Sequence, residues 1–183
     1  MWEPEAERRG LLNNKNTADA VPEFFKNENI EVFVRQGVYT KSEAIARANI
    51  QLENYIKTIR IEALTMIDMA RGQIYPAVSA YIRELCESLS SKKALFDSLP
   101  CTAEISLIKT LATANEKMLD GVNKLEADLA DMPEGEKEGS QRMAHVVVPD
   151  MEAIRVYADK MEKLCAKDRW PFPTYTDILF SVK

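Results

Sequence analysis

A single apolar helical repeat over residues 41–89 constrains the fold of this chain most. Apolar residues recur there at steps of three and four, which is typical of one face of an amphipathic α-helix. They are Ile45, Ala48, Leu52, Ile56, Ile59, Ala63, Met66, Ala70, Ile74, Ala77, Tyr81, Leu85 and Leu89. An unbroken helix of this length would measure about 70–75 Å, whereas a compact domain of this size is only about 40 Å across. The domain is therefore elongated, or its first long helix bends.

The sequence also indicates where this helix begins and where it bends. Thr40 is followed three residues later by Glu43, the spacing of a capping box, in which each side chain satisfies a free backbone N–H of the first turn. Pro76 has no N–H to donate to Gly72, and its ring crowds that turn. We therefore expect a helix that begins after Thr40 and is kinked near Pro76.

Two further long helices follow the first. The second is predicted from Thr102 to about Ala130, and the polar stretch 132–139 is predicted to be a loop. The third begins either at Pro149, a favourable first helical position, or near Ser140 with a kink at Pro149. The apolar faces of these two helices comprise Ile105, Ile108, Leu111, Met118, Val122, Leu125 and Leu129, then Met151, Ile154, Ala158, Met161 and Cys165.

Long amphipathic helices joined by short connections usually pack antiparallel. The predicted fold class is therefore all-α: an elongated antiparallel bundle of three long helices, the first kinked near Pro76, with short N-terminal and C-terminal helices. Residues 1–39 are expected to be an irregular lead-in with short helices, and residues 40–183 the bundle domain. Residues 170–180 form an aromatic tail, expected to dock on the bundle or on a neighbour because burying each large apolar side chain is worth about 1.5–3 kcal/mol. Thr176 is expected to cap a last turn over 177–182.

Composition excludes several classes of protein. The net charge of −5 and the lack of a basic stripe argue against nucleic-acid binding. No apolar run approaches the roughly 20 residues that span a bilayer, and the first residues do not resemble a signal peptide. Cys86, Cys101 and Cys165 are widely spaced, which predicts reduced, buried thiols. A cytoplasmic protein without membrane contact is expected.

The residues of catalytic and metal chemistry are sparse. His145 is the only histidine, and no serine or cysteine motif surrounds it, so we interpret it as a surface or capping residue. Carboxylate-bridged metal sites in helical bundles need paired Glu-x-x-His motifs, which the chain lacks. Glu53 and Glu62 stand too far apart on the first helix to converge. No phosphate-binding glycine loop is present. We therefore predict no catalytic, cofactor-binding or metal-binding residue in this chain.

Several stretches nevertheless resemble one family, in order along nearly the whole chain. The more distinctive are IEALTMIDMA with YPAVSAYIREL at residues 61–85, and WPFPTYTDILF at residues 170–180. ERRGLLN at residues 7–13, VFVRQGVYTKSEA at 32–44 and VPDMEAIRVYADKMEKL at 148–164 agree with them. Together they resemble the C-terminal region of type III glutamine synthetases.

The resemblance implies a role in a larger enzyme. That family ligates ammonia to glutamate with ATP, requires magnesium or manganese, and assembles as stacked rings. Its catalytic motifs lie in an upstream domain, so none of its catalytic residues maps onto a position here, and this segment itself would need no cofactor. The implied partners are the catalytic domain and neighbouring subunits, with a homo-oligomer possible, and the implied role is support of assembly or regulation. A free-standing helical interaction module is the alternative, and a small α-helical enzyme is a third, weaker hypothesis.

Overall fold

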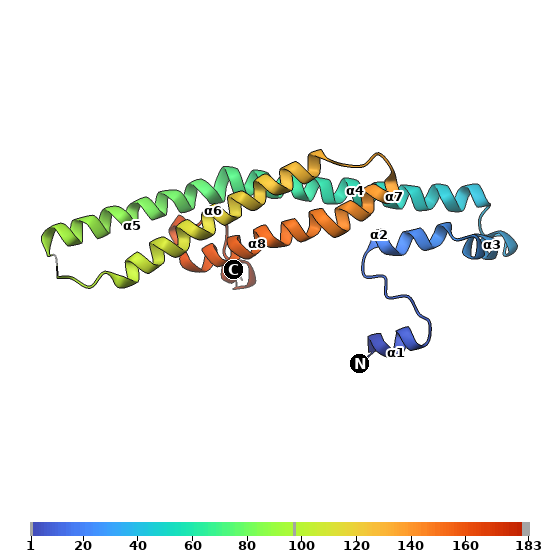
Figure 1. The fold of residues 1–183 in the computed structure, drawn as a ribbon, viewed down its shortest axis with the longest axis horizontal. Helices are drawn as coiled ribbons and strands as arrows, with labels where there is room; N and C mark the ends of the chain where they lie inside the picture. The colour runs from blue at the N-terminus through green and yellow to red at the C-terminus, as the bar shows by residue number, and fades with distance from the viewer. Residues whose placement is uncertain (1, 97, 181–183) are drawn as a thin grey trace. The chain divides into compact units, whose positions relative to one another are not determined.

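The computed structural model describes residues 2–96 and 98–180, and throughout them the regular secondary structure is helical (Figure 1). The all-α prediction is therefore confirmed. The chain divides into two compact units, Met1–Glu62 with Asp131–Val148, and Ala63–Ala130 with Pro149–Lys183. Each long segment expected from the apolar periodicity is helical: residues 41–95, 102–130 and 136–164.

The first unit gathers the short N-terminal helices around the start of the first long helix. Its elements are α1 (Trp2–Arg8), α2 (Thr17–Ala20), the 3-10 turn η1 (Val21–Phe25), α3 (Asn27–Arg35), α4 (Lys41–Met69) up to Glu62, α7 (Glu136–Arg142) and the π-helical turn η3 (Met143–Val147). Val21 packs with Ala48 and Leu52, and the partly buried Phe25 packs against this cluster. The turn η1 is therefore stabilised by the apolar face of α4, because helices of this length are marginal alone.

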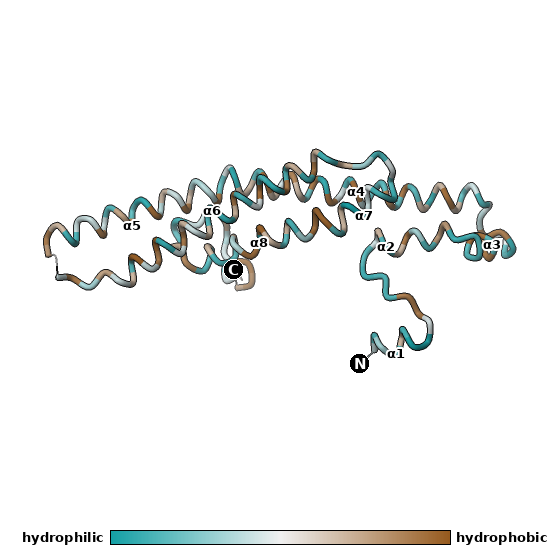
Figure 2. Tube along the Cα trace, viewed as in Figure 1, coloured by the Kyte–Doolittle hydropathy of each residue, from teal (hydrophilic) through white to brown (hydrophobic). Residues whose placement is uncertain are grey.

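The second unit contains antiparallel helices that lie side by side, α5 and α6 (Figure 1). Its elements are the end of α4, the π-helical turn η2 (Ala70–Ile74), α5 (Tyr75–Leu95), α6 (Thr102–Ala130), α8 (Val148–Leu164) from Pro149 onward, the 3-10 turn η4 (Lys167–Arg169) and α9 (Tyr175–Phe180). Figure 2 shows polar and apolar residues alternating along α6 and α8. The apolar residues include the fully buried Leu111, Met118, Val122, Leu125 and Met161, so these positions of the core predicted from periodicity are confirmed.

Both prolines inside long helices follow a π-helical turn. Pro76 is the second residue of α5, directly after η2, and Pro149 is the second residue of α8, directly after η3. In each case the residue before the proline donates its N–H to a carbonyl five residues back, Tyr75 to Ala70 and Val148 to Met143. A π-turn widens the backbone locally and so accommodates a residue that cannot donate. The helix therefore continues through Pro76 with changed winding.

Helix ends agree with the sequence at Thr40 and depart from it elsewhere. The Glu43 N–H donates to Thr40 Oγ1 at 3.2 Å and the Thr40 N–H donates to Glu43 Oε2 at 2.8 Å, which confirms the capping box. The predicted loop at 132–139 is too long, because α7 already begins at Glu136. The last helix is capped by Thr174, not by Thr176: the Asp177 N–H donates to Thr174 Oγ1 at 3.3 Å. Residues 181 and 182 of the expected last turn lie outside the described residues.

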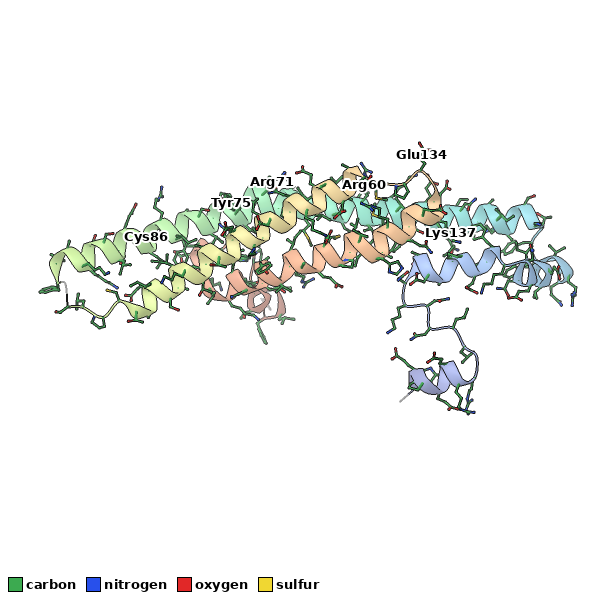
Figure 3. All side chains as sticks on the ribbon, viewed as in Figure 1. Arg60, Arg71, Tyr75, Cys86, Glu134 and Lys137 are labelled. Atoms are coloured by element: carbon green, nitrogen blue, oxygen red, sulfur yellow. The ribbon has the colours of Figure 1, made fainter. Side chains whose placement is uncertain are left out.

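The predicted domain boundary at residues 39 and 40 stays a prediction, and so does the docking of the tail. Trp170 and Phe172 are half-buried, whereas Ile178, Leu179 and Phe180 are exposed. One expectation about the thiols is wrong: Cys101 is buried and Cys165 half-buried, but Cys86 lies exposed on α5 (Figure 3). Among the described residues, none of the helices has the length and apolar character needed to cross a membrane. The cytoplasmic location stays a prediction.

Candidate interaction surface

An apolar hollow of about 250 Å³ opens in the first unit. The end of α3 creates it. Gly37 adopts a left-handed backbone with φ of 66°, which glycine tolerates best. The Gly37 N–H donates to the Val34 carbonyl at 3.1 Å and the Val38 N–H to the Phe33 carbonyl at 3.0 Å, the Schellman pattern of helix termination. The chain thereby reverses and brings Tyr39 back to Phe33, with ring centroids 5.8 Å apart.

Aromatic rings and one cation line this hollow. The rings of Phe24 and Phe33 stack almost parallel, with centroids 5.9 Å apart. The guanidinium of Arg47, on α4, lies 4.7 Å from the centre of the Tyr39 ring, within the range of a cation–π interaction. Ala48 forms part of the buried floor, and Ile50 stands at the rim. The hollow therefore combines apolar walls with a cation able to donate hydrogen bonds.

The hollow lies open at the surface. Phe24 is 41% exposed and Ile50 is 54% exposed. Single exposed apolar residues are ordinary, but several gathered around a hollow mark an interaction surface. This surface could bind an apolar side chain attached to an acceptor for the Arg47 guanidinium.

The second unit carries polar links between its helices. Arg71 donates to Glu126 Oε2 and to Asn123 Oδ1, each at 2.9 Å, and so joins η2 to α6. Figure 3 shows Arg71 one turn from Tyr75 at the junction with α5. Arg169 donates to Glu84 at 2.9 Å. These exposed pairs hold helices in register, and ion pairs of this kind add little stability.

The tail ends in an apolar helix. Thr174 and Asp177 form a capping box at the start of α9, and Lys167 also pairs with the Asp177 carboxylate. These bonds hold the pKa of Asp177 at about 2, with the Lys167 hydrogen bond the largest cause. The cap fixes the helix so that Ile178, Leu179 and Phe180 extend beyond it, and Phe180 is 75% exposed.

The structure also places the residues considered as catalytic or metal-binding candidates. The ring Nε2 of His145 lies 2.9 Å from Asp19 Oδ1, and the imidazole is more than half exposed. Glu53 pairs with Lys57 at 2.5 Å, away from other carboxylates. Across residues 2–96 and 98–180, no three His, Cys, Asp or Glu side chains converge as metal ligands. The absence of catalytic residues stays a prediction.

Sequence reasoning missed the hollow, because residues 1–39 were expected to be an irregular lead-in. Phe24 lines the hollow, but Phe25 packs toward the core. The spacing from Phe33 over Gly37 to Tyr39 was the available signal, because a glycine at the end of a helical pattern predicts a chain reversal.

Comparison with known proteins identifies the family. A family model described as the glutamine synthetase C-terminal domain matches residues 1–93. The chain belongs to the glutamine synthetase C-terminal domain family. The resemblance to type III glutamine synthetases is thereby confirmed.

Relatives of this C-terminal domain are similar over its whole length. The glutamine synthetase of Butyrivibrio fibrisolvens is 36% identical over 185 residues, which cover 100% of this chain and 26% of that protein. The glutamine synthetase of Bacteroides fragilis (strain YCH46) is 26% identical, over 98% of this chain and 26% of that protein. The type-3 glutamine synthetase of Dictyostelium discoideum is also 26% identical, over 98% of this chain and 25% of that protein. The chain thus spans about a quarter of the length of the relatives it matches.

Proposed function

We propose that this domain is a non-catalytic helical part of a glutamine synthetase and supports the assembly or the regulation of that enzyme. The parent protein would ligate ammonia to glutamate with ATP, and its catalytic domain and neighbouring subunits would be the partners of this domain. One observation carries the proposal: the whole chain aligns with about a quarter of each relative, and those relatives are glutamine synthetases.

The side chains of the domain suit contact better than chemistry. ATP and magnesium or manganese, which the parent would use, need clustered carboxylates and phosphate-binding groups. The described residues do not fit that requirement, because their acidic side chains mostly pair with lysine or arginine, as Glu53 does with Lys57 and Glu126 with Arg71. The open hollow of the first unit and the apolar end of α9 are typical of a surface that meets another protein.

A truncation and add-back experiment tests the proposal. The parent enzyme is made without the segment, and glutamine formation and particle mass are measured with and without the purified chain. If the domain supports assembly, truncation lowers both the particle mass and the activity, and the added chain restores them. If it regulates, truncation leaves the particle mass unchanged but alters the response of activity to glutamine or nucleotide.

The chain by itself and an unrelated helical bundle serve as controls. The chain alone should form no glutamine, and the unrelated bundle should restore nothing. Glutamine formation by the chain alone would overturn the non-catalytic assignment. A truncated enzyme with unchanged mass, activity and response would favour a free-standing interaction module instead.

A further inference from the structure

The aromatic rings of the hollow in the first unit form one continuous series. Phe24 stacks on Phe33 with the ring planes 5° apart, and Phe33 lies against Tyr39 at an angle of 59°. The guanidinium of Arg47 lies over the last ring of the series. A planar apolar group that enters the hollow therefore meets aromatic faces and edges, the contacts that rings prefer with one another.

The space in the hollow depends on two small residues of α4. Ala44 and Ala48 line it one turn apart, and each is only 3% exposed. Because their side chains are single methyl groups, a volume of about 250 Å³ stays open. Pockets for drug-sized ligands measure about 300–1,000 Å³. The rim of the hollow is apolar, as in a protein contact, but the space within it suits a smaller molecule that contains one ring.

The charge of the hollow favours an anion. Arg47 has five N–H donors, and no described residue accepts a hydrogen bond from them. Among the described residues, no Asp or Glu lines the hollow. The nearest acidic residue along the chain, Glu43, accepts hydrogen bonds from the N–H and the hydroxyl of Thr40. These bonds are the main cause of its lowered pKa, and Arg47 contributes least. The guanidinium is therefore available to a ligand carboxylate, which it can bind through two parallel hydrogen bonds.

We infer that the hollow is a binding site for a small aromatic carboxylate, with the ring of the ligand among Phe24, Phe33 and Ile50 and its carboxylate on Arg47. A ligand ammonium has no partner there, because the described lining contains no acidic side chain. The site therefore distinguishes an aromatic acid from the corresponding amino acid or amine. Binding of such a ligand is a property of this chain alone and goes beyond the proposed role in assembly or regulation.

Titration of the full 183-residue chain with phenylpropionate, followed by backbone NMR shifts, tests the site. The shifts should saturate with a dissociation constant of about 1 mM, because so small a ligand has few atoms with which to offset its lost freedom. The largest changes should fall on the lining residues 33, 39, 47 and 50.

Three compounds of similar size test the chemistry of the ligand. Phenylpropanamide lacks the negative charge, and phenethylammonium replaces it with a positive one. Both should bind about tenfold more weakly than phenylpropionate, since the charge-assisted hydrogen bonds to the guanidinium are lost. Phenylalanine should also bind more weakly than phenylpropionate, because its ammonium has no partner in the hollow.

Two variants test the two ends of the site. Arg47→Met keeps a long exposed side chain but removes its charge, so phenylpropionate should bind about tenfold more weakly and no better than the amide. Phe24→Leu removes one ring and should weaken binding of both the acid and the amide about threefold to tenfold. Arg60→Met, on the same helix but outside the hollow, and Phe96→Leu, an exposed phenylalanine of the second unit, are the matched controls (Figure 3). Both should bind phenylpropionate as the unchanged chain does.

Three results would refute the site. They are the absence of saturable shifts at the hollow up to about 10 mM phenylpropionate, equal binding of the acid and the amide, and an equal effect of Arg47→Met and Arg60→Met. Tighter binding of a peptide that ends in phenylalanine would assign the hollow to a partner polypeptide and would contradict a small-molecule site. The truncated parent enzyme tests the proposed function separately, so either inference can fail without the other.

Discussion

The side-chain amide of Asn115 on α6 donates a hydrogen bond to the backbone carbonyl of Tyr75, the residue before Pro76, at 3.3 Å. The same nitrogen donates to Ser79 Oγ at 3.1 Å. Asn115 is only 4% exposed, and its Oδ1 is buried without a partner. A buried acceptor without a donor costs about 1–3 kcal/mol. The unpartnered oxygen therefore offsets part of the free energy that this link between α5 and α6 contributes.

Replacing Asn115 with leucine should raise the free energy of unfolding by about 1 kcal/mol. Leucine has nearly the same shape and removes the unpartnered oxygen, while the Tyr75 carbonyl keeps its helical partner and the Ser79 hydroxyl can turn to its own helix. Asn115→Asp, the contrasting variant, should lower stability by about 3 kcal/mol because it buries an unpaired charge. Urea denaturation measures both. A less stable leucine variant would mean that the two donated bonds outweigh the unpartnered oxygen.

Gly121 on α6 should not tolerate a methyl group. A Cβ there would lie 2.9 Å from Cγ1 of Ile154 on α8, which is closer than packed atoms allow. Gly121→Ala gains about 0.5–1 kcal/mol of helix propensity but loses about 1–3 kcal/mol to overpacking, so net destabilisation is expected. Combining it with Ile154→Ala should cost less than the sum of the two single changes. Gly72→Ala is the control, since its Cβ would meet nothing nearer than 3.9 Å.

Acid should weaken the cap of α9. Hydrogen bonds from Lys167 and then Thr174 lower the pKa of Asp177 from its ordinary value of 3.8 to about 2. Because the folded pKa is the lower one, the stabilisation is complete above pH 3.8 and is lost as the pH falls toward about 2. Backbone chemical shifts of residues 175–180 should report this loss in that range.

A substitution checks the origin of this pKa. Lys167→Ala should move the pKa of Asp177 upward toward its ordinary value, because the largest cause of the lowering is then removed. Lys163→Ala, which changes a lysine on α8, should leave the titration unchanged. If Lys167→Ala leaves the pKa of Asp177 unchanged, the hydrogen bonds with Thr174 alone cause the lowering.

The three thiols should react in a fixed order with an alkylating agent. Cys86 is exposed and should be modified first, whereas Cys101 is buried. Burial raises the pKa of Cys165 to about 11, so only about one thiol in a thousand is the reactive thiolate at pH 8. Mass spectrometry of the partly labelled chain gives the order, and labelling in urea shows that all three can react. Early modification of Cys165 would contradict its burial.

Periodicity predicted the long helices and their buried faces because burial of an apolar stripe is what stabilises such helices. Val122 and Leu125, for example, were expected in the core and are fully buried. The same pattern could also have predicted the buried hydrogen bonds of Asn115. This residue lies four residues after Leu111 and three before Met118, within the apolar stripe. A polar residue at such a position predicts a buried hydrogen bond to a neighbouring helix.

The π-turns and the hollow could not be predicted in the same way. Pro76 indicated disturbed helical bonding, but whether the helix kinks or widens depends on the packing around it. The hollow depends on contacts between η1, α3 and α4, which no repeating pattern specifies. The start of α7 was missed because Glu136 follows Gly135 in a stretch whose polar composition is also typical of loops.

The π-turn η2 also has a consequence for the phase of the first long helix. A turn of this kind holds one residue more than an α-helical turn, and one residue corresponds to about 100° of rotation about the helix axis. The face that α5 presents to α6 is therefore offset from the direction in which an uninterrupted α-helix would continue. Deleting a single residue between Ala70 and Ile74 would convert the turn to an ordinary α-helical one and leave Val78 facing its neighbours. The π-turn thus absorbs the extra residue, and the residues that follow keep their direction about the helix axis.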